Sequence, residues 1–479
     1  MTVGTHGGLK QRYVVLSPFD ADARGGAHGN RSRDVVQLDV GGRFEVSRQL
    51  WMRTTLQVFD GQVLGDESAL HAGPRSRLWH NGSLRDDLFL REAVVQVPIG
   101  LGEVRVGRRA GDWGLGMAIH DGRATSSPFA DPHDGDIYNG IIVDAMPLRA
   151  FVKGRAGEAV RLHLGFDVIE RDELVDRKDG DLALRYSGAI LWEERLTSAG
   201  AMIVHRNVDL AWGERSDTLF DVTMSVTRPI ARDLQLIVSA EGAALVGDIT
   251  ERPRPPAEGE SAGAPGRTET RVRQFGAMAR VELEAPARGI GASLELGAAS
   301  GDDDALDGND TAFRFDPAHR VGMILFEEVL ARATAATRSD LLAGDSDAPR
   351  GRVDAFATGG SISSAAYAAP LFRVEACNGC FIGHVGGLVA FAPVGIPAPD
   401  PAASTSKNAN PYGGKATKGL LGWEVNLSAE VRVALPDTAE FSIGTQYGVF
   451  RSGPALRARD GRPEPGMIHK WRVLADVSW

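Results

Sequence analysis

The sequence lacks a long hydrophobic run: no window approaches the roughly 18–20 unbroken apolar residues of a membrane-spanning helix. It is also short of basic residues, with 53 Lys and Arg against 63 Asp and Glu, and the net charge of −10 argues against a nucleic-acid partner. Only 7% of the residues are aromatic, a modest share for a protein with aromatic girdles at both membrane interfaces. These absences exclude a helical membrane protein. They leave open a membrane protein built from strands, in which only every second residue is apolar.

The sequence has only two cysteines, both within Cys377-Asn378-Gly379-Cys380. A metal site would need further Cys or His residues at suitable spacing, and a thioredoxin-like site would need a βαβ context; the sequence shows neither. Asn-Gly is the preferred centre of a two-residue hairpin turn. We therefore predict a β-turn flanked by Cys377 and Cys380, which would form a small local disulfide in an oxidising compartment.

Motifs for enzymatic chemistry are also missing. The histidines are scattered without a serine nucleophile motif, and there is no phosphate-binding loop, dinucleotide fingerprint or zinc spacing. We therefore expect neither an enzyme nor a cofactor. Asp302, Asp304 and Asp307 offer the oxygen ligands that calcium prefers, but the segment lacks the closing Glu of an EF-hand loop. They form a weak calcium candidate, and a solvated acidic loop explains them better.

What the sequence does contain is an alternation of apolar and polar residues. Counted back from the carboxyl end, every second residue is apolar, as expected for a strand with one apolar and one polar face. An edge strand of a soluble sheet has the same pattern. Outer-membrane β-barrels, however, routinely end on such a strand with a final aromatic residue that the assembly machinery recognises. We predict that this assembly signal consists of Trp471, Val473, Val477 and Trp479.

The same alternation recurs along the chain. It runs through residues 36–45, 161–168, 274–284 and 423–433. Runs of about ten residues match the length of a tilted strand that crosses a bilayer. The alternation therefore favours a wall of membrane-crossing strands.

The connectors between these strands alternate between long and short. Residues 451–467 and 394–421 are long, whereas residues 436–439 and 285–288 are short. Outer-membrane barrels combine short periplasmic turns with long external loops. The sequence therefore predicts an all-β fold: a transmembrane antiparallel β-barrel of about eighteen strands, with about sixteen as the alternative. Residues 1–479 would form this single domain, with a first strand near residues 9–17 and the Cys377–Cys380 turn on the periplasmic side.

Two segments depart from the strand pattern. Residues 251–269 are rich in Pro, Gly and Glu, which predicts a mobile external loop. Residues 315–342 indicate a turn followed by a short helix, because Val321, Leu325 and Val329 form an apolar stripe at helical spacing. Such a helix in a long external loop either folds into the lumen as a constriction or packs on the rim as a cap.

One part of the chain resembles a known family. Residues 90–97, a short turn and residues 104–109 are followed by residues 113–116 (Trp-Gly-Leu-Gly). This order is similar to a hairpin of alginate-export-type and porin-like outer-membrane barrels. Residues 315–330 are also similar to a segment of poorly characterised porin-like barrels of gliding soil bacteria. The resemblance implies an outer-membrane barrel of about eighteen strands that exports polar solutes or lets them diffuse. It departs from the alginate exporters, whose lumen is strongly basic, because the inward faces here carry mixed charges.

If the apolar residues face lipid, charged residues of both signs face the lumen. A charged ring in a low-dielectric wall selects ions, and our candidates for such a constriction are Glu92, Arg105, Arg109, Arg161 and Asp167. The alternative is that opposite charges on neighbouring strands pair and merely solvate the interior. The other inward charges are Asp39, Arg43, Glu45, Arg185, Glu241, Arg280, Glu282, Glu295, Glu424, Glu430, Arg432, Arg472 and Asp476.

The predicted function is an outer-membrane channel that passes or exports polar solutes, with oligosaccharides and polysaccharides among the candidates. The alternative is a non-conducting barrel that anchors an envelope-spanning assembly, for example motility or secretion machinery. The expected partners are the lipid bilayer with its lipopolysaccharide, the outer-membrane assembly machinery and, for the alternative, envelope proteins. Residues 1–6 show neither the basic start nor the apolar stretch of a signal peptide, so we expect that the signal was removed or is omitted from this sequence.

Overall fold

The computed structural model describes most of the chain. The residues outside its description are 1, 21–26, 29–30, 48, 66–87, 124–126, 131–134, 176, 178–179, 211–212, 253–268, 305–307, 344–356, 399–408, 436–438 and 461–463. Nearly all of the predicted mobile loop 251–269, together with Asp307, lies outside the described residues.

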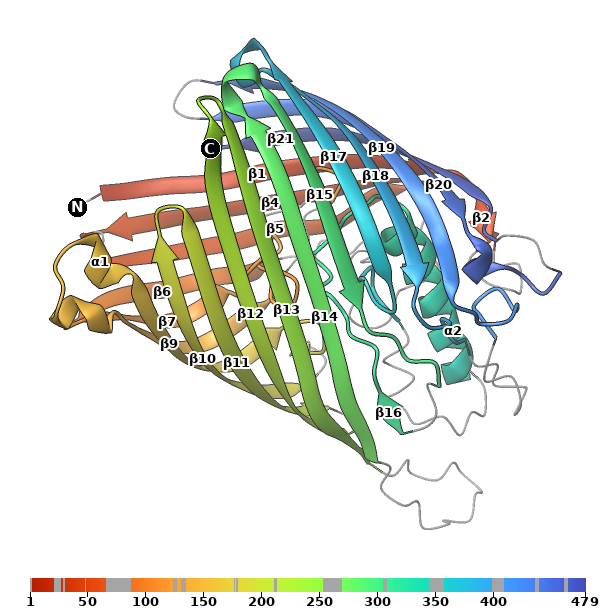
Figure 1. The fold of residues 1–479 in the computed structure, drawn as a ribbon, viewed down its shortest axis with the longest axis horizontal. Coiled ribbons are helices and arrows are strands. Elements are labelled where there is room, and N and C mark those ends of the chain that lie inside the picture. The colour runs from red at the N-terminus through yellow and green to blue at the C-terminus, as the bar shows by residue number, and fades with distance from the viewer. Residues whose placement is uncertain are drawn as a thin grey trace.

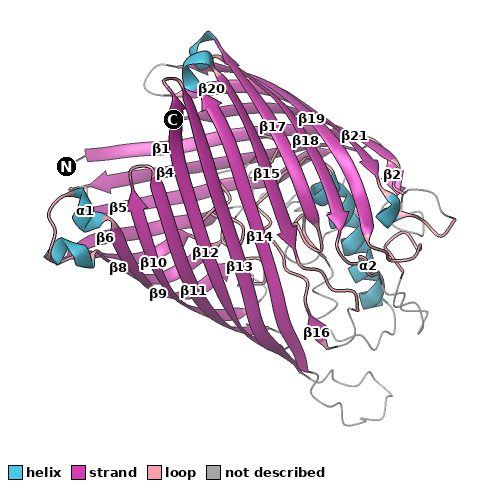
Figure 2. Cartoon of the chain, viewed as in Figure 1, coloured by secondary structure: helices cyan, strands magenta, loops and turns pink. Residues whose placement is uncertain are grey.

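The chain forms one closed antiparallel barrel of eighteen strands (Figures 1 and 2). The ring closes because β1 pairs with both β4 and β21. The strands of the wall are β1 (Thr2–Leu16), β4 (Arg31–Glu45), β5 (Trp51–Gly65), β6 (Phe89–Ile99), β7 (Gly102–Ala110), β8 (Ile137–Ala145), β9 (Val160–Arg171), β10 (Leu182–Glu194), β11 (Thr197–Leu210), β12 (Gly213–Ala231), β13 (Leu234–Glu251), β14 (Glu269–Ala285), β15 (Ile290–Ala299), β17 (Ala366–Ala376), β18 (Phe381–Ala392), β19 (Gly419–Ala434), β20 (Glu440–Ser452) and β21 (Met467–Ser478).

Short elements lie in the connectors. The two-residue strands β2 (Phe19–Asp20) and β3 (Ala27–His28) pair with each other, and β16 (Asn309–Asp310) pairs parallel to β14. The helices are α1 (Arg155–Glu158) and α2 (Ala331–Ala343), the latter preceded by a π-helical turn over Leu325–Leu330. Among the residues that the structure describes, no helix is long and apolar enough to cross a membrane. The predicted short helix within residues 315–342 is confirmed.

The alternation of the sequence matches the two faces of the wall. On β9, Leu164 and Phe166 are 65% and 46% exposed on the outside, whereas the adjacent Asp167 is fully buried inside. Apolar side chains therefore form an outer belt, and polar side chains line the interior. A wall that leaves no strand edge and turns such a belt outward is suited to a bilayer.

The two ends of the barrel differ in their connectors. The short turns, such as those between β6 and β7 and between β12 and β13, lie at the same end as both termini, and the long connectors lie at the other (Figure 1). This confirms the predicted arrangement. The first strand, however, begins at Thr2 rather than near residue 9. Its early part contains Gly4, Gly7 and Gly8, which supply no apolar alternation although their backbone pairs with β4.

Two long connectors fold back into the barrel. We call the described residues 111–123, 127–130 and 135–136, between β7 and β8, the first inner loop, and residues 311–343, between β15 and β17, the second inner loop. Trp113, Met117 and Phe129 of the first are buried together with Phe315 and Met323 of the second. The apolar core of the protein therefore lies in the middle of the lumen.

Candidate functional site

The first inner loop is attached to the wall where it enters the lumen. Trp113 Nε1 donates to Asp221 Oδ1 on β12 at 2.8 Å, and the Leu115 N–H donates to Glu241 Oε2 on β13. Farther along, Arg123 Nη1 lies 3.4 Å from Glu92 Oε2 on β6.

The second inner loop is attached by one wall carboxylate at the start of its helix. Glu424 on β19 accepts the N–H of Met323, of Ile324 at 3.1 Å and of Leu325 at 2.9 Å. These N–H groups lie at the start of the π-helical turn and have no partner one turn earlier in the helix. A carboxylate there satisfies them and interacts favourably with the positive end of the helix dipole.

Buried ion pairs then fix the second inner loop. Lys470 Nζ lies 2.9 Å from Glu327 Oε1 and 2.7 Å from Glu328 Oε1. Arg33 on β4 also reaches Glu328 at 2.8 Å, and Arg332 of α2 reaches it at 2.8 Å. Glu328 is fully buried, so these cations are what keeps its charge in the interior.

The two inner loops also contact each other. The Asp316 N–H donates to the Met117 carbonyl at 2.7 Å. Arg472 on β21 donates to the Phe129 carbonyl at 3.0 Å and lies 3.5 Å from Glu327 Oε1. One wall arginine therefore joins both loops.

The inner loops border two cavities. One cavity lies toward the end with the long connectors, and residues 118–119 and 313–314 of the loops line part of it; the space there, open solvent included, is about 930 Å³. A smaller cavity, with about 340 Å³ of space counted in the same way, lies nearer the short turns, where residues 127 and 129 and Val321 reach it.

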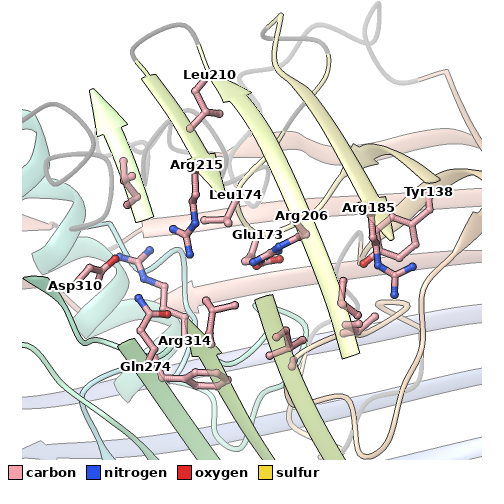
Figure 3. Close-up of a pocket in the computed structure, with 17 residues that line it drawn as sticks. Tyr138, Glu173, Leu174, Arg185, Arg206, Leu210, Arg215, Gln274, Asp310 and Arg314 are labelled. Atoms are coloured by element: carbon pink, nitrogen blue, oxygen red, sulfur yellow. Dashed lines mark hydrogen bonds and ion pairs between the residues drawn. The ribbon is translucent and has the colours of Figure 1, made fainter. Parts of the chain in front are cut away.

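The larger cavity combines an arginine row with apolar walls (Figure 3). Arg185, Arg206, Arg215 and Arg314 reach it from β10, β11, β12 and the second inner loop. The remaining lining side chains are Ala118, Ile119, Tyr138, Glu173, Leu174, Val204, Leu210, Leu219, Leu245, Ile249, Gln274, Asp310 and Phe313.

Wall carboxylates hold the arginine row in place. Asp217 Oδ1 accepts from Arg206 at 2.8 Å, and Asp217 Oδ2 accepts from Arg215 at 2.6 Å. The Arg185 guanidinium lies 3.0 Å from Asp167 Oδ2 and 4.4 Å from the centre of the Tyr138 ring. The guanidinium groups are thus oriented, and their charge is partly balanced.

The structure separates the constriction candidates into several clusters. Arg109 and Asp167 do meet, at 2.6 Å, with Arg185 on the other side of Asp167. Arg105 instead pairs with Asp144 at 2.5 Å. Glu92 accepts from Thr55 at 2.8 Å, and Arg161 lies on β9 nearer the short turns. Their pairing across strands agrees with the alternative interpretation of the inward charges, and a role in a constriction stays a prediction.

Sequence reasoning missed the arginine row beyond Arg185. Arg206 and Arg215 flank the connection between β11 and β12 and occupy inward positions in the alternation. The first inner loop was also missed, although the apolar residues Trp113, Leu115 and Met117 in a long connector were a usable signal. An external loop exposed to water would not favour such a cluster.

Three further predictions concern the surface. Cys377 and Cys380 are free thiols in the turn between β17 and β18. A disulfide between them in an oxidising compartment stays a prediction. Among the described residues, no three acidic, Cys or His side chains gather as metal ligands.

The predicted assembly signal lies on the outer face of the last strand. Trp471, Val473 and Trp479 are 54%, 40% and 39% exposed, and the backbone of Trp479 pairs with that of Gly7 on β1. The signal residues therefore sit beside the closure of the ring, and their recognition by assembly machinery stays a prediction.

No protein-family model and no curated protein matches the sequence. Solved structures of Pseudomonas aeruginosa proteins share the fold. OpdQ has 8% sequence identity and a TM-score of 0.53, covering 100% of this chain and 97% of that one. OpdK, solved with vanillate, has 10% identity and a TM-score of 0.52, covering 99% of each chain. The outer membrane protein OprD has 9% identity and a TM-score of 0.50, covering 99% and 93%. These likenesses show the fold, which with its apolar outer belt places the chain in the outer membrane.

Proposed function

We propose that this chain is an outer-membrane channel for small polar solutes that carry a carboxylate. The observation that supports it is the cavity, open to solvent, in which four arginines meet apolar side chains. A guanidinium offers two parallel N–H donors to a carboxylate, and Leu219 and Phe313 provide a surface for an apolar part of the solute. OpdK, which has the same fold, was solved with vanillate, an aromatic carboxylate.

Arginines whose charge is partly neutralised suit a channel, which must release its solute, better than a tight binding site. Arg206 already pairs with Asp217, Asp172 and Glu173, so most of its hydrogen-bonding capacity is occupied. Asp217 and Asp167 occupy only part of the capacity of Arg215 and Arg185. Transport through a channel requires binding that favours entry and still allows release. A carboxylate would therefore bind weakly at each arginine.

The structure supports small solutes over a polysaccharide. The two inner loops fill the middle of the lumen with buried side chains, among them Met117, Phe129 and Met323. The same observation supports a second candidate, the non-conducting barrel that anchors an envelope assembly. In the channel that we propose, the second inner loop forms the constriction.

Single-channel recording in a planar bilayer tests the proposal, with vanillate compared with the uncharged vanillyl alcohol. We expect vanillate, and not the alcohol, to interrupt the ion current. The double variant Arg215→Gln/Arg314→Gln should weaken the block about tenfold, the value for a lost charge-assisted hydrogen bond. Arg373→Gln, at an exposed pair with Glu375 near the short turns, is the matched control.

Equal effects of vanillate and the alcohol would contradict the carboxylate assignment. No current with either would favour the non-conducting barrel. Removing residues 318–340 tests the placement of the constriction: conductance should rise several-fold if this segment narrows the lumen and stay unchanged if it caps the rim.

A further inference from the structure

The first inner loop depends on a pair of wall carboxyl groups that contact each other. Asp221 and Glu241 are 1% and 3% exposed, and they hold Trp113 and Leu115 as described above. The carboxyl groups of the two side chains also lie within hydrogen-bonding reach of each other.

A hydrogen bond between two carboxyl groups contains a proton, because two carboxylates have no donor between them. Among the described residues, Asp221 Oδ2 and Glu241 Oε1 have no N–H or O–H partner, so these oxygens are available for it. Ionising both groups in a buried site would place two like charges side by side. The attachment of the loop at its start therefore requires one proton.

A second carboxyl pair lies where the other end of the first inner loop meets Asp316 of the second inner loop. Asp136 and Asp316 are 2% and 3% exposed, and His120 connects them: its carbonyl accepts the Asp136 N–H at 2.8 Å, and its N–H donates to the Asp316 carboxyl. Burial raises the pKa of both aspartates well above the usual value, and the charge of Asp316 raises the pKa of Asp136 further.

The groups that face this second pair are mainly acidic. Asp172 and Glu173, in the connector after β9, add negative charge, and burial raises the pKa of Asp172 itself to about 6. Tyr138 on β8 donates its O–H to Asp136 at 2.9 Å. Arg206 on β11 is occupied by Asp172 at 3.1 Å and Glu173 at 2.6 Å. Within the described part of the chain, no ion pair joins Asp136 or Asp316 to a cation.

The π-helical turn of the second inner loop is different, because its two carboxylates, Glu327 and Glu328, face cations. Lys470 and Arg33 contact Glu328 directly, and Lys470 also contacts Glu327. Such carboxylates stay ionised without a proton.

We propose that the first inner loop is a proton-controlled gate, held across the lumen while its two carboxyl pairs are protonated and released when they ionise. The proposal rests on the proposed function and names its regulation. A carboxyl group whose pKa is raised in the closed state stabilises that state at low pH and loses this effect as pH rises through the raised pKa. Solute passage should therefore increase with pH.

The test combines hydrogen exchange with conductance between about pH 5 and about pH 9, which spans the range of shifted carboxyl groups. The measured quantity is the ratio of the exchange protection of residues 113–122 to that of residues 323–336. The intrinsic exchange rate depends on pH in the same way for both segments, so this dependence cancels in the ratio. We expect this ratio to fall several-fold as pH rises, and single-channel conductance to rise over the same range.

The double variant Asp221→Asn/Glu241→Gln keeps acceptor oxygens for Trp113 and Leu115 and cannot ionise. In this variant the protection ratio and the conductance should change little with pH, and the first inner loop should stay protected from exchange at high pH. Glu430→Gln, on the wall beside Arg432, is the control and should respond as the wild type does.

A ratio that is constant with pH, or a double variant that responds as the wild type does, would overturn the gate. If the protection ratio falls as pH rises but the protein carries no current in the bilayer, the proton-controlled release of the loop stands and the channel function is rejected. The two proposals can therefore fail separately.

Discussion

The two inner loops are attached in the same way and differ in the charges around the attachment. Each enters the lumen at a wall glutamate that accepts backbone N–H groups, Glu241 for the first loop and Glu424 for the second. Beyond that point, the first loop meets further carboxyl groups, whereas Glu328 of the second loop meets cations. Beyond the attachment points, Glu328 is kept ionised by the cations beside it, whereas Asp136 lies among acidic groups and its charge depends on pH.

The largest expected effect comes from removing the charge at the centre of the second loop. Glu328→Gln leaves Arg33 and Lys470 buried with one carboxylate fewer, and breaking such a pair costs about 3–5 kcal/mol. We expect this loss in the free energy of unfolding, measured by denaturant titration in lipid or detergent. Glu430→Gln, at a partly exposed pair, should cost about 1 kcal/mol or less. Equal losses would show that the ion pairs do not hold the loop.

A smaller effect separates the two wall glutamates. Glu424→Gln replaces a carboxylate that accepts three N–H groups and should cost about 1.5–3 kcal/mol of local stability. Glu241→Gln should cost about 1 kcal/mol or less, because the carboxyl pair already contains a proton. Hydrogen exchange of residues 323–330 and 113–118 measures each loss. The opposite order would mean that Glu241 is ionised and the comparison is wrong.

The smallest effect concerns the far end of the first loop. Tyr138→Phe removes the O–H that favours the ionised form of Asp136, so the pKa of Asp136 should rise further. Since the closed state is lost as pH rises through this pKa, the midpoint of release should move upward by less than about 1 pH unit, the equivalent of one hydrogen bond. The pH titration of the protection ratio measures it. Tyr447→Phe, which loses only its contact to His469, should leave the midpoint unchanged, and a downward shift in Tyr138→Phe would contradict the sign.

The wall could be predicted from the sequence because its signal is local. In residues 423–433 the alternation of apolar and polar side chains indicates which residues face outward and which face the lumen. The connector lengths indicate which strand ends lie at which end of the barrel. The helix of the second loop was predicted for the same reason: Leu325 and Val329 of the apolar stripe are buried in its π-helical turn, whereas Val321 precedes the helix.

The attachment of the loops could not be predicted, because it joins residues far apart in the chain. Glu241 and Glu424 were recognised as inward acids, but their partners Leu115 and Met323 are 126 and 101 positions away. Those partners are backbone N–H groups, which every residue except proline has. Side-chain identity therefore offered no indication of the contact.

The closure of the ring has a consequence for the order of assembly. Lys470 and Arg472 belong to β21, the last strand, and Arg33 belongs to β4, on the other side of β1. The cations that surround Glu327 and Glu328 therefore come from both sides of the seam and meet only once it is sealed. Before that step the second inner loop has no complete binding site, and afterwards each of its ion pairs also resists reopening of the seam. The pairing of β1 with β21 and the docking of the second inner loop in the lumen therefore depend on each other.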